Sequence, residues 1–298
     1  MAGGHWVHDL DPFVWRISGD FGIRWYGVSY LVGIVLGWWL LRRWARQGRL
    51  PMASAEVGDF AMTVALGMIA GGRLGYAAFY EPALFVTWSD GFPWWKLLAL
   101  HEGGMASHGG MIGIALAAWW WSWRRRQHPL VLGDALAAVG PLGIACGRIA
   151  NFINGELWGR PWDGPWAVIF PHADPPVPRH PSQLYAAVLE GLLIAAILLP
   201  LHARHRRPGL TLGGFAVLYG LGRFIGEFFR EPDRGQPGFG DIPPLLGFMS
   251  KGQALTLPLF AIGLWLIWRA WRRPPQPAAY APLRAAEPPA APAGPAPR

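Results

Sequence analysis

Long apolar runs alternate with short polar connections along most of the chain. Seven runs stand out, at about residues 25–41, 57–80, 105–123, 133–153, 183–201, 210–229 and 252–268. A helix needs roughly 20 apolar residues to cross the hydrocarbon core of a bilayer, and these runs approach or reach that length. The pattern predicts an all-α polytopic membrane protein with seven transmembrane helices.

Arginine clusters follow every second apolar run. Their members are Arg42, Arg43, Arg46 and Arg49, then Arg124, Arg125 and Arg126, then Arg204, Arg206 and Arg207, and finally Arg269, Arg272 and Arg273. Cytoplasmic loops of membrane proteins carry an excess of basic residues. The clusters therefore predict that the N-terminus lies outside and the C-terminus in the cytoplasm, which agrees with an odd number of spans.

The outer side receives three longer connections, at about residues 81–104, 154–182 and 230–251. They are rich in Gly, Pro, Trp and Asp, a composition typical of loops, and we expect them to form a small cap. Residues 1–273 would make one transmembrane domain. The remaining residues, 274–298, are a Pro/Ala-rich segment with few side chains that could pack, and they predict a disordered cytoplasmic tail.

Composition supports the membrane class and argues against others. Only 15% of the residues are charged and 52% are hydrophobic, whereas about one quarter of an average soluble domain is charged. The net charge of +8 comes from clusters between apolar runs rather than from a basic patch with interleaved aromatics, so no nucleic-acid partner is expected. Cys146 is the single cysteine, which excludes an intramolecular disulfide and a cysteine-rich zinc site. We expect no metal and no cofactor.

Three glycine-arginine pairs interrupt the apolar runs that lead from inside to outside. They are Gly72-Arg73, Gly147-Arg148 and Gly222-Arg223, and each falls in the outer half of its run. An arginine within a span costs roughly 2.5–3.5 kcal/mol on insertion scales, so it normally faces a protein interior or a water-lined cavity. Three together predict an anion, or several carboxylates, in an internal cavity.

The sixth run carries a polar stripe. Tyr219, Arg223, Glu227 and Arg230 follow one another at i, i+4, i+8 and i+11, which confines them to one face of a helix. We expect this face to point inward.

A second polar group interrupts the fourth run, in the stretch "CGRIANFINGELWGRP" (146–161). Arg148 and Asn151 share a helical face at i, i+3. Asn154 and Glu156 are predicted to follow the end of the helix, where Asn-Gly breaks the pattern.

A histidine stands in the glycine-rich stretch "HEGGMASHGGMIG" (101–113), at the outer mouth of the third run. Glycines around His108 let the backbone adopt unusual conformations and approach a ligand. Histidine is a natural general base near neutral pH, although a lone histidine is also often structural.

Other interpretations of the intramembrane charges stay open at this stage. Glu156, Glu190 and Glu227 could neutralise the arginines in a purely structural network that specifies helix packing. An anion transporter or lipid flippase would also place arginines in a cavity, but it needs a path to both sides, and few polar residues other than Glu56 and Asp59 occupy the inner halves. A structural or receptor-like protein would need neither the histidine stretch nor a one-sided arginine set.

Five motifs carry a resemblance to a known family. They are "GRIANFINGELWGRP" (147–161), "GGRLGYAAFY" (71–80), "HGG" (108–110), "RHPSQLY" (179–185) and "YGLGRFIGEFFREPD" (219–233), with "RWYG" (24–27) in addition. The chain from about residue 20 to residue 270 resembles the prolipoprotein diacylglyceryl transferases of bacterial inner membranes. One departure is Ala150, where many members of the family have glycine.

The resemblance implies an activity and a set of partners. Members transfer the diacylglyceryl group of phosphatidylglycerol to the lipobox cysteine thiol of a preprolipoprotein, which binds through its signal peptide, and glycerol phosphate is released. The lipid bilayer is the surrounding medium, and no cofactor is implied. The family also implies a periplasmic N-terminus and cap, with an active site toward the periplasmic side.

The resemblance also assigns roles to residues. The expected catalytic residues are His108, Arg148, Arg223 and Tyr26. The expected substrate-binding residues are Arg73, Asn151, Asn154, Glu156, Tyr219, Glu227 and Arg230.

Overall fold

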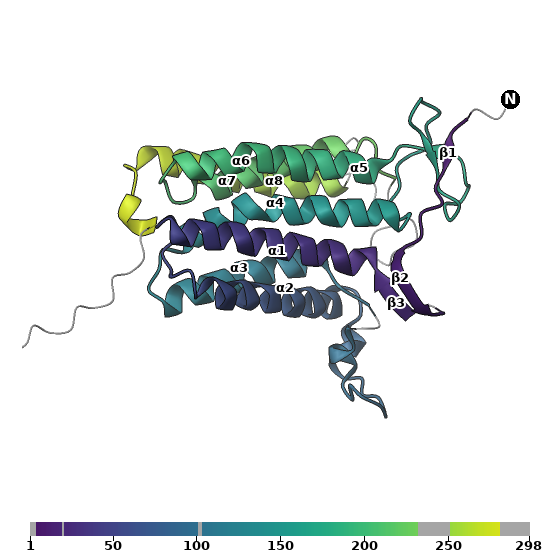
Figure 1. Ribbon diagram of the computed structural model, residues 1–298, viewed down its shortest axis with the longest axis horizontal. Coiled ribbons are helices and arrows are strands. Elements are labelled where there is room, and N and C mark those ends of the chain that lie inside the picture. Colours follow the sequence, from purple (N-terminus) through teal and green to yellow (C-terminus); the bar gives the residue numbers. More distant parts are fainter. Residues whose placement is uncertain (1–3, 20, 101–102, 232–250, 281–298) are drawn as a thin grey trace, which may run out of the picture.

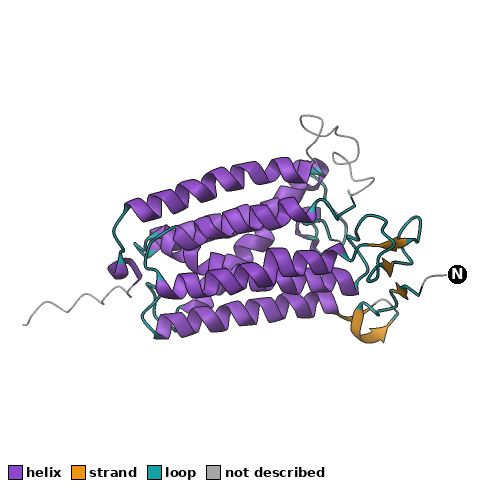
Figure 2. Ribbon diagram, turned by 90° about the horizontal axis from the view of Figure 1, so that it is seen from above, coloured by secondary structure: helices purple, strands orange, loops and turns teal. Residues whose placement is uncertain are grey.

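A computed structural model describes residues 4–19, 21–100, 103–231 and 251–280. Within these ranges seven long helices run along the longest axis of the molecule (Figure 1; Figure 2). Six are α1 (Trp25–Arg46), α2 (Val57–Phe79), α3 (Ser107–Arg124), α4 (Pro129–Ile153), α7 (Leu210–Gly226) and α8 (Lys251–Arg272). The seventh is composite, formed by α5 (Ser182–Ala186), a π-helical segment η4 (Ala187–Leu192) and α6 (Leu193–Arg204). Each predicted apolar run therefore coincides with a helix.

Three of these helices are long and apolar enough to cross a membrane. They are Val57–Phe79, Pro129–Ile153 and Ser182–Arg204, and Leu210–Gly226 is apolar but shorter. The molecule is thus a mostly helical membrane protein.

Glycines allow neighbouring helices to approach closely. A Cβ atom on Gly71 of α2 would stand 2.4 Å from the carbonyl oxygen of Gly109 in α3, and one on Gly33 of α1 would stand 2.9 Å from the Cα of Gly143 in α4. Small residues spaced along a helix are a common way to pack helices where the hydrophobic effect supplies no driving force. Helix α4 contacts α1, α3, α6 and α7, and it is the central element of the bundle.

Short strands cover the end of the bundle at which the chain begins (Figure 1). Strand β1 (Trp6–Val7) pairs with β4 (Val168–Ile169), which pairs with β5 (Pro178–Arg179); β2 (Phe13–Ser18) and β3 (Phe21–Arg24) form a separate antiparallel pair. Two short 3₁₀ helices, η1 (Pro82–Phe85) and η2 (Lys96–Leu98), lie in the 81–104 connection.

The all-α prediction is therefore wrong for this end: β1, β4 and β5 have two residues each, too few to show an alternating pattern, and β2 and β3 have only six and four. Most of the expected 230–251 connection lies outside the described residues.

The basic helix ends gather at the opposite end of the bundle. The last turns of α1, α3, α6 and α8 all carry arginines. Consecutive helices are antiparallel, so every second helix end falls on the same side. This is the alternation that the sequence predicts.

Most of the predicted disordered tail, residues 281–298, lies outside the described residues, and the described part of the segment after α8 contains an ordered element. A 3₁₀ helix, η5, covers Pro277–Tyr280, and Tyr280 is only 1% exposed. Its hydroxyl donates to Oδ2 of Asp134 at 3.1 Å, and burial raises the pKa of this hydroxyl. Asp134 also accepts the backbone N–H groups of Gly209 and Leu212, each at 2.8 Å, and so caps the start of α7. Composition alone could not reveal that one aromatic side chain has a buried partner.

Candidate active site

Five charged residues meet between α4, η4 and α7. Arg148 donates to Oε2 of Glu190 through Nη2 at 2.8 Å and through Nε at 3.2 Å. Nη1 of Arg223 lies 3.9 Å from Oε1 of Glu190, and Arg223 also forms an ion pair with Glu227. Nη1 of Arg230 lies 3.8 Å from Oε1 of Glu227. We call these five residues the arginine–carboxylate cluster.

Local helix geometry explains how the cluster forms. Glu190 lies on the π-helical segment η4, and such one-turn widenings of a helix occur frequently at functional sites. Gly191 and Gly222 bring the neighbouring helices close: a Cβ on Gly191 would stand 2.6 Å from that of Ala145, and one on Gly222 would stand 2.9 Å from the carbonyl oxygen of Leu189. The side chains of Arg148 and Arg223 therefore reach the same carboxylate, Arg148 at Oε2 and Arg223 at Oε1.

The arginine–carboxylate cluster brings two arginines to one buried carboxylate. Its three guanidinium groups face two carboxylates, and the Glu190 side chain is only 1% exposed. The side chains of Arg148 and Arg223 are 23% and 19% exposed. Arg148 and Arg223 therefore share one buried carboxylate and remain in part accessible to a second anion, which guanidinium groups can bind in a bidentate geometry.

The space inside the cluster is small. A cavity of about 20 Å³ is lined by Arg148, Glu190, Arg223 and Arg230, together with Ser182, Gln183 and three apolar or glycine residues. This volume holds about one water molecule. A phosphate group can enter only if these side chains move apart.

A second polar group lies beside the end of α4. Nδ2 of Asn151 donates to Oε1 of Glu156 at 2.8 Å and lies 3.5 Å from the hydroxyl of Tyr26. The backbone carbonyl of Glu156 accepts Nε2 of Gln183 at 2.7 Å. Helix α4 ends at Ile153, so the prediction that Asn154 and Glu156 follow the helix is confirmed.

Two tyrosines connect this group to the arginines. Tyr219 on α7 interacts with Arg148 through its hydroxyl. Tyr30, one turn after Tyr26, packs against it with the two rings tilted by 52° and their centroids 5.1 Å apart, and it lies near Arg148 and Glu156. The side-chain oxygen of Asn154 is buried and accepts no hydrogen bond from the described residues.

Arg73 has a different environment from the other predicted site residues. Its guanidinium donates five hydrogen bonds to backbone carbonyls, those of Leu97 (2.8 Å), Lys96 (2.8 Å), Ala99 (3.3 Å), Gly103 (2.6 Å) and Gly104 (3.1 Å). The side chain is 5% exposed. None of these bonds connects it to the arginine–carboxylate cluster. Arg73 therefore holds residues 96–99 and 103–104, which we call the 96–104 segment, against α2, and its donors are already used.

His108 is the second residue of α3, directly after this held segment. Its side chain is exposed and forms no hydrogen bond to the described part of the chain. Ala106 N donates to the carbonyl of Gly72 at 2.9 Å, so the start of α3 is tied to the residue next to Arg73. Residues 101 and 102 of the predicted histidine stretch lie outside the described residues.

Sequence reasoning noted Glu190 only as a possible neutralising charge, and it missed Tyr30 and Gln183. Glu190 is the carboxylate that both Arg148 and Arg223 approach. An acidic residue inside an apolar run is itself a signal of function. Tyr30 could have been found as the i+4 neighbour of Tyr26 on an apolar helix. No group of His, Cys, Asp and Glu that could hold a metal ion occurs among the described residues.

Comparison with known proteins identifies the family. The sequence profile described as "Prolipoprotein diacylglyceryl transferase" matches residues 12–269. A phosphatidylglycerol–prolipoprotein diacylglyceryl transferase of Rhodopseudomonas palustris is 45% identical over 274 residues, which cover 89% of this chain and 91% of that protein. Proteins of the same name are 45% identical in Bradyrhizobium diazoefficiens (86% of this chain, 90% of the relative) and 43% identical in Ruegeria pomeroyi (88% and 96%). The chain is therefore a multi-pass membrane protein that belongs to the prolipoprotein diacylglyceryl transferase family.

Proposed function

We propose that the arginine–carboxylate cluster is the active site of phosphatidylglycerol–prolipoprotein diacylglyceryl transferase activity. The activity follows from the family and from relatives of nearly equal length. The substrates are phosphatidylglycerol in the bilayer and the lipobox cysteine of a preprolipoprotein, whose signal peptide binds alongside. The assignment of the reaction to this cluster is supported by two partly accessible guanidinium groups, those of Arg148 and Arg223, which meet at the buried carboxylate of Glu190.

The helices cross the bacterial inner membrane seven times, with the strand-bearing end in the periplasm. The arginine-rich ends of α1, α3, α6 and α8 support this orientation, because basic residues are retained on the cytoplasmic side. Arg148 and Arg223 lie near the ends of α4 and α7 that approach the strands. The reaction would then take place toward the periplasmic side of the membrane.

The reaction exchanges a C–O bond for a C–S bond. The cysteine sulfur attacks the glyceryl carbon that bears the phosphate, and the electron pair of the breaking C–O bond leaves with glycerol phosphate. Negative charge grows on the phosphate oxygens as the bond breaks. Guanidinium groups suit these oxygens because they donate in a planar, bidentate geometry. Arg148 and Arg223 would stabilise this charge where little water competes.

The thiol must also lose its proton, because the thiolate is the nucleophile. His108 would accept it as the general base, since its ring is exposed and not engaged by the described residues.

The remaining site residues would position the lipid and the arginines. The residues that would orient the glycerol part of the lipid are Tyr26, Asn151, Asn154 and Glu156. Tyr219, Glu227 and Arg230 would hold Arg148 and Arg223 in place until the lipid arrives. Arg73 would act on substrate binding through the 96–104 segment rather than through the phosphate.

A transporter is less well supported. Glu56, one of the few acidic residues at the arginine-rich end, forms an ion pair with Arg125. It therefore does not extend a polar path from the cluster through the bundle.

The experiment that tests the proposal measures transfer directly. Purified protein in detergent is incubated with phosphatidylglycerol and a lipobox peptide that contains one cysteine. Mass spectrometry then follows the gain of diacylglyceryl on sulfur and the release of glycerol phosphate. We expect Arg223→Gln to lose at least about 100-fold in rate, the range for removing a donor to a developing oxyanion. Arg124→Gln, an exposed arginine at the other end of the bundle, should keep full activity. An Arg223→Gln variant that folds and stays fully active would contradict the proposal.

A further inference from the structure

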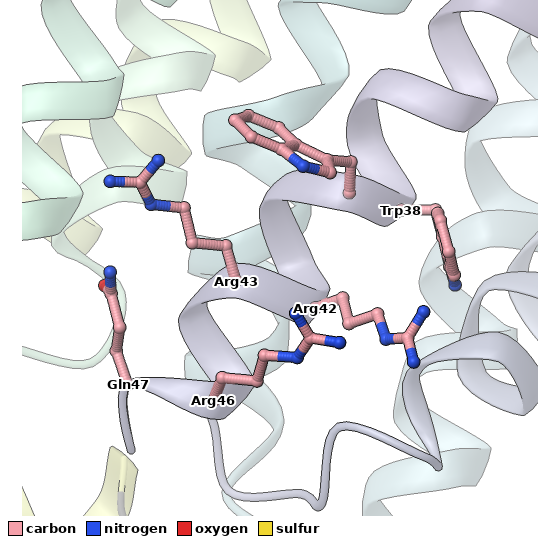
Figure 3. A pocket seen from close by; sticks show the side chains of 6 residues that line it. Trp38, Arg42, Arg43, Arg46 and Gln47 are labelled. Carbon is pink, nitrogen blue, oxygen red and sulfur yellow. The ribbon is translucent and has the colours of Figure 1, made fainter.

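A second arginine-lined hollow, open to the surface and lined by residues of one helix and the residue after it, lies at the end of α1 far from the arginine–carboxylate cluster. Its volume is about 430 Å³, and its lining residues are Trp38, Trp39, Arg42, Arg43, Arg46 and Gln47. We call it the α1 cavity. Figure 3 shows arginine side chains on both sides of the helix, with Arg42 and Arg46 extending to one side and Arg43 and Gln47 lining the other. Arg42 lies roughly 24 Å along α1 from Tyr26, at about 1.5 Å per residue.

The arginines of the α1 cavity have no carboxylate partners among the described residues. Arg42 lies over the ring of Trp38 at 5.1 Å and Arg43 over that of Trp39 at 5.7 Å, while the buried Nε of Arg42 has no hydrogen-bond acceptor in the described part of the chain. Two other arginines at this end have protein partners. Arg125 pairs with Glu56, and Arg207 donates to the carbonyl of Ala270 at 3.1 Å. The α1 cavity therefore gathers three positive charges whose side chains remain able to bind an anion.

An apolar surface of α1 continues from the cavity. Leu31, Ile34 and Val35 are exposed by 60%, 45% and 49%, and Ile34 and Val35 precede the two tryptophans by one helical turn. This surface would face acyl chains in a membrane. A ligand that fits both parts combines an anionic head with apolar tails, and Trp side chains are favoured at the level where the two meet. A free phosphate ion would use only the arginines.

We propose that the α1 cavity binds the headgroup of an anionic phospholipid, separately from the lipid that reacts. The phosphate would accept hydrogen bonds from Arg42 and Arg46, which extend to the same side of α1 (Figure 3). The glycerol region would lie against Trp38 and Trp39, and the acyl chains along the apolar face of α1. Basic pockets at the cytoplasmic ends of transmembrane helices recognise phospholipid headgroups in this way. Under the orientation proposed above, this lipid belongs to the cytoplasmic leaflet.

Photo-crosslinking tests the proposal at the level of individual peptides. Full-length protein in a non-ionic detergent is mixed with phosphatidic acid that carries a diazirine in one acyl chain, irradiated and digested. We expect labelling of the peptide that spans residues 31–41, and competition by unlabelled phosphatidic acid but not by phosphatidylcholine. Arg42→Gln/Arg46→Gln should reduce this labelling by at least about tenfold, given the contribution of each basic residue to anionic-lipid binding.

A matched control removes the same charge from the same end of the bundle. Arg124 and Arg272 also lie over tryptophan rings, at 5.5 and 5.4 Å, but they do not line the α1 cavity. Arg124→Gln/Arg272→Gln should keep the labelling, and both double variants should keep transfer activity. If the first double variant does not fold, Arg46→Gln alone tests the same point, because its side chain is exposed.

Each of the following results would overturn the proposal. One is unchanged labelling of the 31–41 peptide in Arg42→Gln/Arg46→Gln, or in Arg46→Gln where that variant is used instead. An equal loss of labelling in the control variant has the same meaning. Another is competition by phosphatidylcholine as strong as that by phosphatidic acid. Labelling abolished by millimolar inorganic phosphate alone would also contradict it, because the cavity would then recognise an ion rather than a lipid.

Discussion

Replacing Glu190 by glutamine removes the charge that Arg148 and Arg223 share and changes the volume very little. Arg148 donates to it at 2.8 and 3.2 Å, and Arg223 lies 3.9 Å away. Two unit charges about 4 Å apart interact by about 4 kcal/mol at an effective dielectric constant near 20. Breaking a buried pair costs about 3–5 kcal/mol. Because Arg148 keeps 23% of its side-chain exposure, hydration offsets part of the loss and favours the lower end, about 3 kcal/mol.

The assay combines thermal unfolding in detergent with transfer kinetics. A loss of this size lowers Tm by roughly 6 °C, at about 2 °C for each kcal/mol in a chain of this length. We expect kcat to fall by about 100-fold, the scale that follows when a reacting group is misplaced by about 1 Å. The KM for phosphatidylglycerol should not rise, because the variant removes a negative charge that competes with the phosphate.

The matched control is Glu56→Gln at the other end of the bundle. Glu56 also pairs with an arginine, Arg125, but the two side chains are 28% and 45% exposed. Such a pair contributes about 0–1 kcal/mol, so we expect little change in Tm and none in kcat. A Glu190→Gln variant as stable and as active as the wild type would refute the electrostatic reasoning, as would an equal loss in the control.

Three further variants test other parts of the account. Arg73→Met removes five hydrogen bonds to the 96–104 segment. We expect it to lower the free energy of unfolding by about 3 kcal/mol and to raise the KM for phosphatidylglycerol. Arg73→Lys should restore little, because an ammonium group donates only three hydrogen bonds. A chain that ends at residue 276 should have a free energy of unfolding about 3 kcal/mol lower than one that ends at residue 280, which retains the buried Tyr280. The chain that ends at residue 280 should match the full-length protein in a thermal melt. His108→Gln should lose most transfer activity and recover part of it as pH rises, since hydroxide then deprotonates the thiol; a loss of equal size at every pH would contradict a role as base.

The sequence predicts the helices well because a long apolar run is a signal contained within one continuous stretch of the chain. Each apolar run coincides with a helix, and the arginine clusters follow alternate runs. The short strands were not predicted, because β1 and β4 have two residues each and pair across more than half the chain. The ordering of Tyr280 depends on Asp134, a residue far away in sequence, so it has no local signal either.

The site residues show the same division between local and distant information. The stripe of Tyr219, Arg223 and Glu227 is a property of one helix, and its arrangement could be predicted from spacing. The position of Glu190 between Arg148 and Arg223 depends on three helices and on a π-helical turn that no spacing reveals. Arg73 resembles Arg148 in sequence, as an arginine after a glycine in an apolar run. The two differ because a nearby connection supplies carbonyl groups to Arg73 only.

The measurement that tests the central claim most directly is a single turnover of enzyme already loaded with phosphatidylglycerol. Thioether formation is followed after a lipobox peptide is added in excess, for the wild type, Arg148→Lys and Arg148→Gln. If Arg148 stabilises the departing phosphate, the rate of this chemical step should fall at least about 100-fold in Arg148→Gln, with a smaller change in lipid binding. Arg148→Lys should lie between the two, because lysine keeps the charge but not the bidentate geometry. An unchanged chemical step in a folded, lipid-loaded Arg148→Gln variant would contradict the account.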